Sequence, residues 1–373
     1  MQRNDIAMSL KAAILKFLSR KTYTDDFRPE TFKNILIVRP AKIGDTICMF
    51  PLIRELNRFL PDAKIDIYAS TYNNFMFQHA PQVRHVYTKY KDRDSLKTVA
   101  EIFEMRTNRY DLIIDTIDIR FGKVIALAFI KARWLIANVG YESRYGLNNA
   151  DLDFYYKLTD WKQIHTTDRL LEFLQLLGID DYDSSINFPI GDEAYQFAES
   201  FLKPYQGKKL IGLNADASDR DRSILDAEII DICNGIKAFD SKIRILLFSS
   251  VSRREHMAAL IKQARFDNVI LENGTTSIFE AAALTSFMNV MISPNTSFVH
   301  IASAFDIPTV AIFQNDQNHL TYWAPRSSRY IIIKPEKPGT SVRGFSVNDT
   351  VNATIDLIKD ESYINQPPFQ IET

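Results

Sequence analysis

Apolar and polar positions alternate along the chain in a way that predicts strands and helices in turn. In the first half, short apolar runs predict strands at residues 35–38, 64–69, 86–89, 110–115 and 134–139. Between them, apolar residues at helical spacing predict helices over residues 47–56, 95–106, 124–130 and 165–178. Residues 140–156 have weak periodicity and predict a loop. Such strand–helix alternation is typical of a parallel sheet covered by helices.

The second half repeats the pattern. Strands are predicted at residues 209–214, 243–248, 269–271, 290–293 and 309–313, with helices over 229–239, 255–264, 278–284 and 298–305. We therefore predict an α/β protein of two Rossmann-like domains, residues 34–190 and 191–350, facing across a cleft. Residues 1–33 form an N-terminal helix and a polar linker in this prediction, and residues 351–373 form a C-terminal helix and a loosely held tail.

The N-terminal helix has two interpretations. Ile6, Leu10, Ile14 and Leu18 recur every four residues, and Leu15 and Phe17 widen this apolar face. Residues 1–23 carry five basic residues and one acidic residue. The helix then either rests on an anionic membrane surface or packs on the protein's own surface.

Composition narrows the class of protein. A hydrophobic content of 46% with 24% charged residues is that of a globular protein, and a net charge of −1 argues against a general attraction to nucleic acid. Two distant cysteines exclude a disulfide framework and a thiolate zinc site. No apolar run approaches the ~20 residues needed to cross a bilayer. The N-terminal segment is not expected to be a signal peptide, because lysines interrupt the apolar stretch that a signal peptide requires. These features predict a cytoplasmic protein.

One carboxylate follows the first predicted strand. Pro40 ends that strand, Gly44 permits a tight turn, and Asp45 lies where the next helix begins. This edge of an open α/β sheet is where ligands bind. The alternative is that Asp45 only caps the helix.

Polar side chains follow several other strands and converge on the same kind of edge. The most informative segment is 293–300, in which a strand ends, the chain turns, and Thr296 and Ser297 open a helix. Free backbone N–H groups, hydroxyls and the helix dipole suit a phosphate there, although an N-cap without a ligand has the same pattern. His300 either contacts a ligand or is a buried structural residue. Residues 219–222 supply guanidinium groups for a phosphate, or form a solvated charged loop.

Asp-x-Asp, a pattern found in metal-dependent sugar transfer, occurs four times, at residues 92–94, 151–153, 181–183 and 219–221. All four lie in charged or turn-prone segments, so we assign none of them a metal. The chain has no Gly-x-Gly-x-x-Gly, Walker loop or His-Glu-x-x-His.

Two of these stretches resemble a known family. Residues 35–55, with the core Arg-Pro-x-x-Ile-Gly-Asp, resemble the opening of glycosyltransferase family 9, the ADP-heptose:lipopolysaccharide heptosyltransferases. Residues 293–313 resemble that family's second signature. The resemblance runs from about residue 33 to 330. It implies the B-type glycosyltransferase fold, inversion at the anomeric carbon and no required metal or other cofactor.

The resemblance also implies roles for single residues. Asp45 is the expected general base, with Lys42, Asp115 and Arg120 on the acceptor side. The expected donor-binding residues are Asn214, Arg220, Arg222, Glu272, Asn295, Thr296, Ser297 and His300. The implied partners are an ADP-linked sugar and a glycolipid acceptor of the lipid A-core type, used at the inner face of the cytoplasmic membrane.

Some positions depart from the family pattern. Asn295 stands where the family commonly has Asp, Gln314 replaces a Gly, and Lys/Arg-x-Trp-Pro is here Arg-Ser-Ile-Leu from Arg222. These departures leave open a different nucleotide-sugar, a protein acceptor, or a non-catalytic nucleotide-sugar binder.

Overall fold

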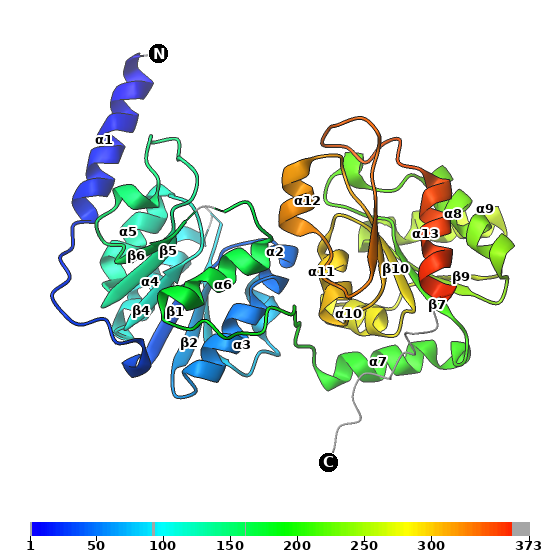
Figure 1. The fold of residues 1–373 in the computed structure, drawn as a ribbon, viewed down its shortest axis with the longest axis horizontal. Helices are drawn as coiled ribbons and strands as arrows, with labels where there is room; N and C mark the ends of the chain where they lie inside the picture. The colour runs from blue at the N-terminus through cyan, green and yellow to red at the C-terminus, as the bar shows by residue number, and fades with distance from the viewer. Residues whose placement is uncertain (1, 92–93, 161, 360–373) are drawn as a thin grey trace. The chain divides into compact units, whose positions relative to one another are not determined.

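The computed structural model describes residues 2–91, 94–160 and 162–359, which form two compact units, Met1–Ser184 and Ser185–Thr373 (Figure 1). The predicted polar tail lies outside the described residues, as do two residues of the first Asp-x-Asp pattern. Each unit is built on one parallel six-stranded sheet. The predicted α/β class with two Rossmann-like domains is therefore confirmed.

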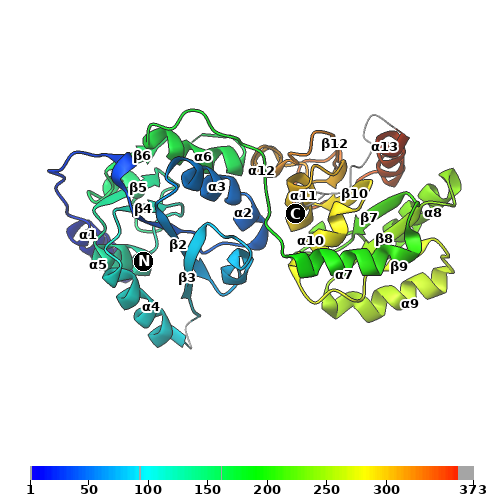
Figure 2. The same ribbon diagram turned by 90° about the horizontal axis from the view of Figure 1, so that it is seen from below.

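The first sheet has the strand order β3-β2-β1-β4-β5-β6. Its strands are β1 (Asn34–Val38), β2 (Lys64–Ser70), β3 (Val83–Lys89), β4 (Leu112–Asp115), β5 (Trp134–Asn138) and β6 (Lys157–Thr159). The helices α4 (Ser95–Thr107) and α5 (Phe121–Ile130) lie on one face, while α3 (Phe50–Phe59) and α6 (Thr166–Leu176) pack together on the other (Figure 2). The N-terminal helix α1 (Gln2–Leu18) packs on α5.

The second sheet has the order β12-β11-β10-β7-β8-β9. Its strands are β7 (Leu210–Asn214), β8 (Arg244–Phe248), β9 (Val269–Leu271), β10 (Val290–Pro294), β11 (Thr309–Ile312) and β12 (Tyr330–Ile333). The helices are α7 (Asp192–Leu202), α8 (Asp226–Phe239), α9 (Arg254–Ala264), α10 (Ile278–Ser286), α11 (Ser297–Ala304), α12 (Gln317–Trp323) and α13 (Val347–Lys359).

Both sheets therefore follow one plan. If the strands of each unit are counted from its first, each sheet has the order 3-2-1-4-5-6, in which the chain reverses direction across the sheet between the first and fourth strands. Ligands of such sheets bind at this switch point, outside the carboxyl ends of the strands. The pairs that flank it are β1 with β4 and β7 with β10.

Several predicted elements need correction. The single helix predicted over residues 47–56 is two, α2 (Ile43–Ile47) and α3, because the chain bends between them at Cys48 and Met49. Strands β6 and β12 and helix α12 were not predicted, since short edge elements have too few positions to show a period. Helix α7, just after the predicted domain boundary, was not predicted either; it packs on α10.

The N-terminal helix also differs from its prediction. The edge that packs on the domain is formed by Met8, Ala12 and Leu15, of which Leu15 is fully buried. Ile6 and Leu10, which were predicted to face inward under the packing interpretation, are 69% and 62% exposed. The helix thus packs on the protein through the Leu15 edge of its predicted apolar face, while the Ile6 and Leu10 edge stays exposed.

Candidate active site

Asp45 lies at the switch point of the first unit and does not cap its helix. It occupies the first turn of α2, whose N-cap is Lys42 without a side-chain cap bond. The Arg39 guanidinium, which is nearly buried, approaches the Asp45 carboxylate at 3.3 Å (Nη2 to Oδ1). The Asp45 side chain remains 28% exposed. The carboxylate is therefore held by one cation and still reaches solvent, which suits a group that takes a proton from a ligand.

Two side chains that the sequence did not single out as site residues hold the loop of Asp45 in place. Arg39 donates to the Thr116 carbonyl at 3.3 Å, so it connects the end of β1 to the end of β4. Asn73, at the end of β2, donates to the Arg39 carbonyl at 2.8 Å and to the Thr46 hydroxyl at 3.0 Å. Arg39 belongs to the Arg-Pro-x-x-Ile-Gly-Asp motif, whereas the sequence around Asn73 contains no such signal. Together they tie the 39–46 backbone to the segments that follow β2 and β4.

Asp115, at the end of β4, has a different environment. Its carboxylate is fully buried and lies 2.6 Å from the Lys123 ammonium of α5 (Oδ2 to Nζ), and it also accepts a hydrogen bond from the Tyr155 hydroxyl. Burial lowers the pKa of Lys123, against the opposing effect of Asp115, and raises that of Tyr155. A paired carboxylate without exposed surface favours a role in positioning residues 116–121 over direct contact with an acceptor. Lys42 and Arg120, by contrast, are exposed.

The switch point of the second unit is closed by Asn214. Its side-chain amide lies 3.1 Å from both the Ser293 and the Thr296 hydroxyls, so the end of β7 is joined to the end of β10. Thr296 is the N-cap of α11 and accepts from the Phe298 backbone N–H at 3.3 Å. Ser297 opens the helix and is partly exposed. The cap is thus present, and the helix N-terminus beside it has the dipole and free N–H groups that attract an anion.

Three of the other predicted donor residues of this unit are buried. Asn295 is buried at the end of β10, and His300 is buried with its ring 5.8 Å from that of Trp323. Glu272 is 2% exposed and accepts from the Thr275 backbone N–H at 2.7 Å, while Arg254 lies 3.6 Å away. The Glu272 carboxylate therefore organises the loop after β9, which favours a positioning role over donor contact.

The arginines after β7 remain available. Residues 220–222 form a short 3₁₀ turn capped by Asp219. Arg220 is exposed, and the partly exposed Arg222 donates to the Ser218 hydroxyl at 3.0 Å. Arg343, which the sequence did not indicate, donates to the Ser223 carbonyl at 2.7 Å and fixes the turn from the far end of the unit. Two guanidinium groups thus lie on a braced turn after β7.

Three of the described Asp-x-Asp carboxylates take part in local structure. Asp151 belongs to a capping box with Asn148, Asp219 caps its turn, and Asp183 pairs with Arg54 at 3.0 Å. These three side chains therefore have structural roles.

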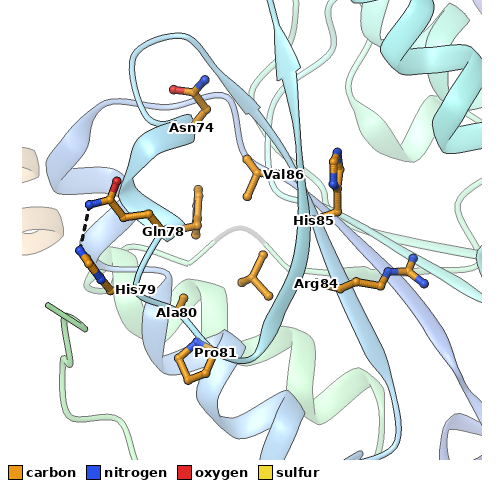
Figure 3. Close-up of a pocket in the computed structure, with 10 residues that line it drawn as sticks. Asn74, Gln78, His79, Ala80, Pro81, Arg84, His85 and Val86 are labelled. Carbon is orange, nitrogen blue, oxygen red and sulfur yellow. Dashed lines mark hydrogen bonds between the residues drawn. The ribbon is translucent and has the colours of Figure 1, made fainter. Parts of the chain in front are cut away.

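A pocket lies away from these loops, beside the edge strand β3 (Figure 3). It is lined by η2 (Asn74–Phe77), residues 78–81 and the first half of β3. Arg84 points away from it in Figure 3 and pairs with the buried Asp66, with Nε 2.8 Å from Oδ1. Because Asp66 already neutralises the Arg84 guanidinium, the described residues that line the pocket offer histidine and amide groups and no further cation for binding an anion.

The two sheets with their switch-point loops define the class. Two Rossmann-like domains, one with an exposed carboxylate and the other with arginines and a helix N-terminus at the switch point, have the fold and the groups of a B-type glycosyltransferase. A family model described as glycosyltransferase family 9 (heptosyltransferase) matches residues 102–344. The chain belongs to that family, and the predicted resemblance is confirmed. It is a glycosyltransferase, so the non-catalytic alternative is not favoured.

Individual relatives agree with this assignment. The chain is 19% identical to the lipopolysaccharide core heptosyltransferase OpsX of Haemophilus influenzae over 76% of this chain and 80% of that protein. It is 21% identical to the putative lipopolysaccharide heptosyltransferase 4 of Escherichia coli, over 87% and 88%.

The fold is also that of a solved family 9 glycosyltransferase from Veillonella parvula, with a TM-score of 0.75 and 15% identity over 90% of this chain and 99% of that one. The E. coli heptosyltransferase WaaC, solved with ADP-2-deoxy-2-fluoro heptose, gives a TM-score of 0.64 at 18% identity over 87% and 99%.

Proposed function

We propose that the protein transfers a heptose or a related sugar from an ADP-linked donor to an inner-core acceptor of lipopolysaccharide, with inversion at the anomeric carbon and without a metal or other cofactor. The observation that carries the proposal is Asp45, a partly exposed carboxylate that does not cap its helix, at the switch point of a family 9 chain. The names of the relatives support the sugar and the acceptor. The acceptor places the reaction at the inner face of the cytoplasmic membrane.

In the proposed reaction, the acceptor hydroxyl attacks the anomeric carbon while Asp45 takes its proton, and the bond from that carbon to the diphosphate breaks. The departing diphosphate gains negative charge. Arg220, Arg222 and the backbone N–H groups at Thr296 and Ser297 are the groups that stabilise it. Asn214 holds Thr296 in position. Lys42 and Arg120 bind the acceptor.

Asn295 supports a second candidate, the same chemistry with another nucleotide-sugar or with a protein acceptor. An amide keeps the hydrogen-bonding capacity of the carboxylate common at this position but loses its charge, so the preferred sugar can differ. Calorimetric titration with ADP- and UDP-sugars, followed by mass analysis of the products, distinguishes the two candidates.

The test of the mechanism is Asp45→Asn, which keeps the shape of the side chain and removes the base. We expect the transfer rate to fall by about 10²–10⁴ while the affinity for ADP is unchanged. Asp62→Asn is the matched control, because Asp62 is a highly exposed carboxylate that pairs with Lys33 and precedes β2. Transfer by Asp45→Asn at the wild-type rate would exclude Asp45 as the base. Asp45 precedes the residues matched by the family model, so this variant tests its role independently of that match.

A further inference from the structure

Large exposed apolar side chains gather on one helical layer of the first unit. Among the described residues, nine of the eighteen such side chains lie on α1, α4 and α5: Ile6, Leu10, Ile14, Phe17, Leu18, Leu96, Val99, Phe103 and Ile125. Helices α1 and α4 both pack on α5, on the same face of the sheet (Figure 2). Single exposed apolar residues are ordinary, whereas a concentration of them marks an interaction surface.

On α1 these side chains form a defined stripe. At about 100° per residue, Ile6, Leu10, Ile14 and Phe17 fall within about 80° of the helix circumference. The edge that packs on the domain, with Met8, Ala12 and Leu15, lies on the opposite side. The stripe therefore points away from the protein.

Basic residues flank the α1 stripe on both sides. Lys11 lies on one side, with its ammonium 5.9 Å from the centre of the Phe121 ring, and the exposed Lys16 and Arg20 lie on the other. Residues 6–24 contain no Asp or Glu. An apolar stripe between two basic borders is the arrangement of a helix lying in the interface of an anionic bilayer, where long basic side chains reach the headgroups.

Helix α4 carries the second stripe. Leu96, Val99 and Phe103 are 83%, 46% and 58% exposed and recur at helical spacing. The Phe103 ring lies 4.9 Å from that of Phe129, one turn beyond the exposed Ile125 of α5. The apolar surface therefore continues from α4 onto α5.

The base of α1 is fixed to the domain. Lys21 donates to the Ala132 and Arg133 carbonyls at 2.6 and 2.7 Å, and the Tyr23 ring stacks on Trp134 with centroids 4.9 Å apart. The segment predicted as a polar linker thus holds α1 in one place. A fixed stripe presents its side chains without first paying to order the segment that carries it.

We propose that the α1 stripe and the α4 stripe together form a face that docks the enzyme on an anionic lipid bilayer. The proposal rests on the proposed function only in that a glycolipid acceptor gives the enzyme a reason to bind a membrane. The flanking cations favour a bilayer over a second copy of the chain, because the net charge of −1 supplies no strongly acidic counterpart.

The test is co-sedimentation of the full chain with vesicles of phosphatidylethanolamine and phosphatidylglycerol (3:1) and with pure phosphatidylcholine. We expect binding to the anionic vesicles that weakens with salt. Ile6→Gln/Leu10→Gln/Phe17→Gln should weaken it at least tenfold, and Leu96→Gln/Val99→Gln severalfold. Neutralising Lys11, Lys16 and Arg20 to Gln should cost about a hundredfold, at ~1 kcal/mol for each basic residue. Phe239→Gln/Val251→Gln, two exposed apolar residues of the second unit, is the matched control and should bind normally.

Equal binding by wild type and the α1 variant would overturn the proposal, and equal binding by the α4 variant would remove α4 from the face. Sedimentation velocity supplies the remaining outcome: a wild-type dimer that the stripe variants dissociate would assign the face to self-association. Sugar transfer to a deacylated, water-soluble acceptor separates this proposal from the proposed function, since the stripe variants should retain it. Vesicle binding can be measured even if no sugar is transferred.

Discussion

The buried pair of Lys123 and Asp115 gives the sharpest stability prediction. Their charged atoms lie 2.6 Å apart, and their side chains are 4% and 0% exposed. Lys123→Met keeps most of the aliphatic stem and removes the cation, which leaves the Asp115 carboxylate buried with the Tyr155 hydroxyl and a 3.3 Å contact to the Ile117 N–H. Breaking a buried pair in this way costs about 3–5 kcal/mol. Because Tyr155 remains, we expect about 3 kcal/mol.

The double variant Asp115→Asn/Lys123→Met isolates the pair. Neither side chain is then charged, so the unfolding free energy should return to within about 1 kcal/mol of wild type. The coupling between the two positions should exceed about 2 kcal/mol. Lys33→Met is the matched control, because the Lys33–Asp62 pair is exposed and should contribute less than about 0.5 kcal/mol.

Urea unfolding followed by tryptophan fluorescence and by circular dichroism measures these energies; Trp134 contributes to the signal from β5, which pairs directly with β4. Two results would refute the reasoning. One is a loss of unfolding free energy below about 1 kcal/mol for Lys123→Met. The other is a loss in the double variant as large as the sum of the losses in the two single variants. Transfer kinetics then tests the role of Asp115. If the stable double variant keeps the wild-type KM for acceptor, Asp115 is a positioning residue; a KM raised tenfold with kcat unchanged would show direct contact.

Two further predictions concern stability alone. Burial raises the pKa of Tyr23 and Tyr68 to about 12 from 10.0. Between those values the unfolded chain loses protons that the folded protein keeps, so the free energy of unfolding should fall as pH rises from 10 to 12. Tyr23→Phe should make this fall shallower in urea titrations at pH 9–11.5. An equally steep fall in the variant would contradict the prediction. Gly212→Ala would place a Cβ 2.5 Å from the Met291 sulfur and should destabilise by about 1–3 kcal/mol, whereas Gly122→Ala, in an open helical position, should stabilise by about 0.5–1 kcal/mol; thermal melts that reverse this order would contradict it.

The central strands of both sheets could be predicted from the sequence because they carry strong local signals. β1, β4, β7 and β10 are runs of buried, mostly β-branched or aliphatic residues. Their order within each sheet, which sets the switch point, came only from the structure. The polar residues after them, Asp45, Asn214 and Thr296, could be selected for the same reason. Each lies at the carboxyl end of a strand or a few residues beyond it, where open α/β sheets bind ligands.

Whether each of these polar side chains is exposed to solvent depends on residues distant in sequence. Asp45 and Asp115 both follow a strand, yet Arg39 leaves the first partly exposed, whereas Lys123 and Tyr155 enclose the second. Glu272 is likewise buried by its own loop. No local pattern distinguishes these carboxylates, because exposure is set by what packs over them.

The N-terminal helix shows the same division. Its sequence determined that it is a helix, since apolar residues at helical spacing suffice for that. It did not determine the face that packs, because apolar side chains occur on more than one side of the helix and only α5 decides which of them is covered. The sequence by itself thus determined the central strands, most of the helices and the loops at the strands' carboxyl ends through short-range periodicity. Tertiary packing decided which charges are free and which apolar faces remain open, because burial is a property of the whole fold.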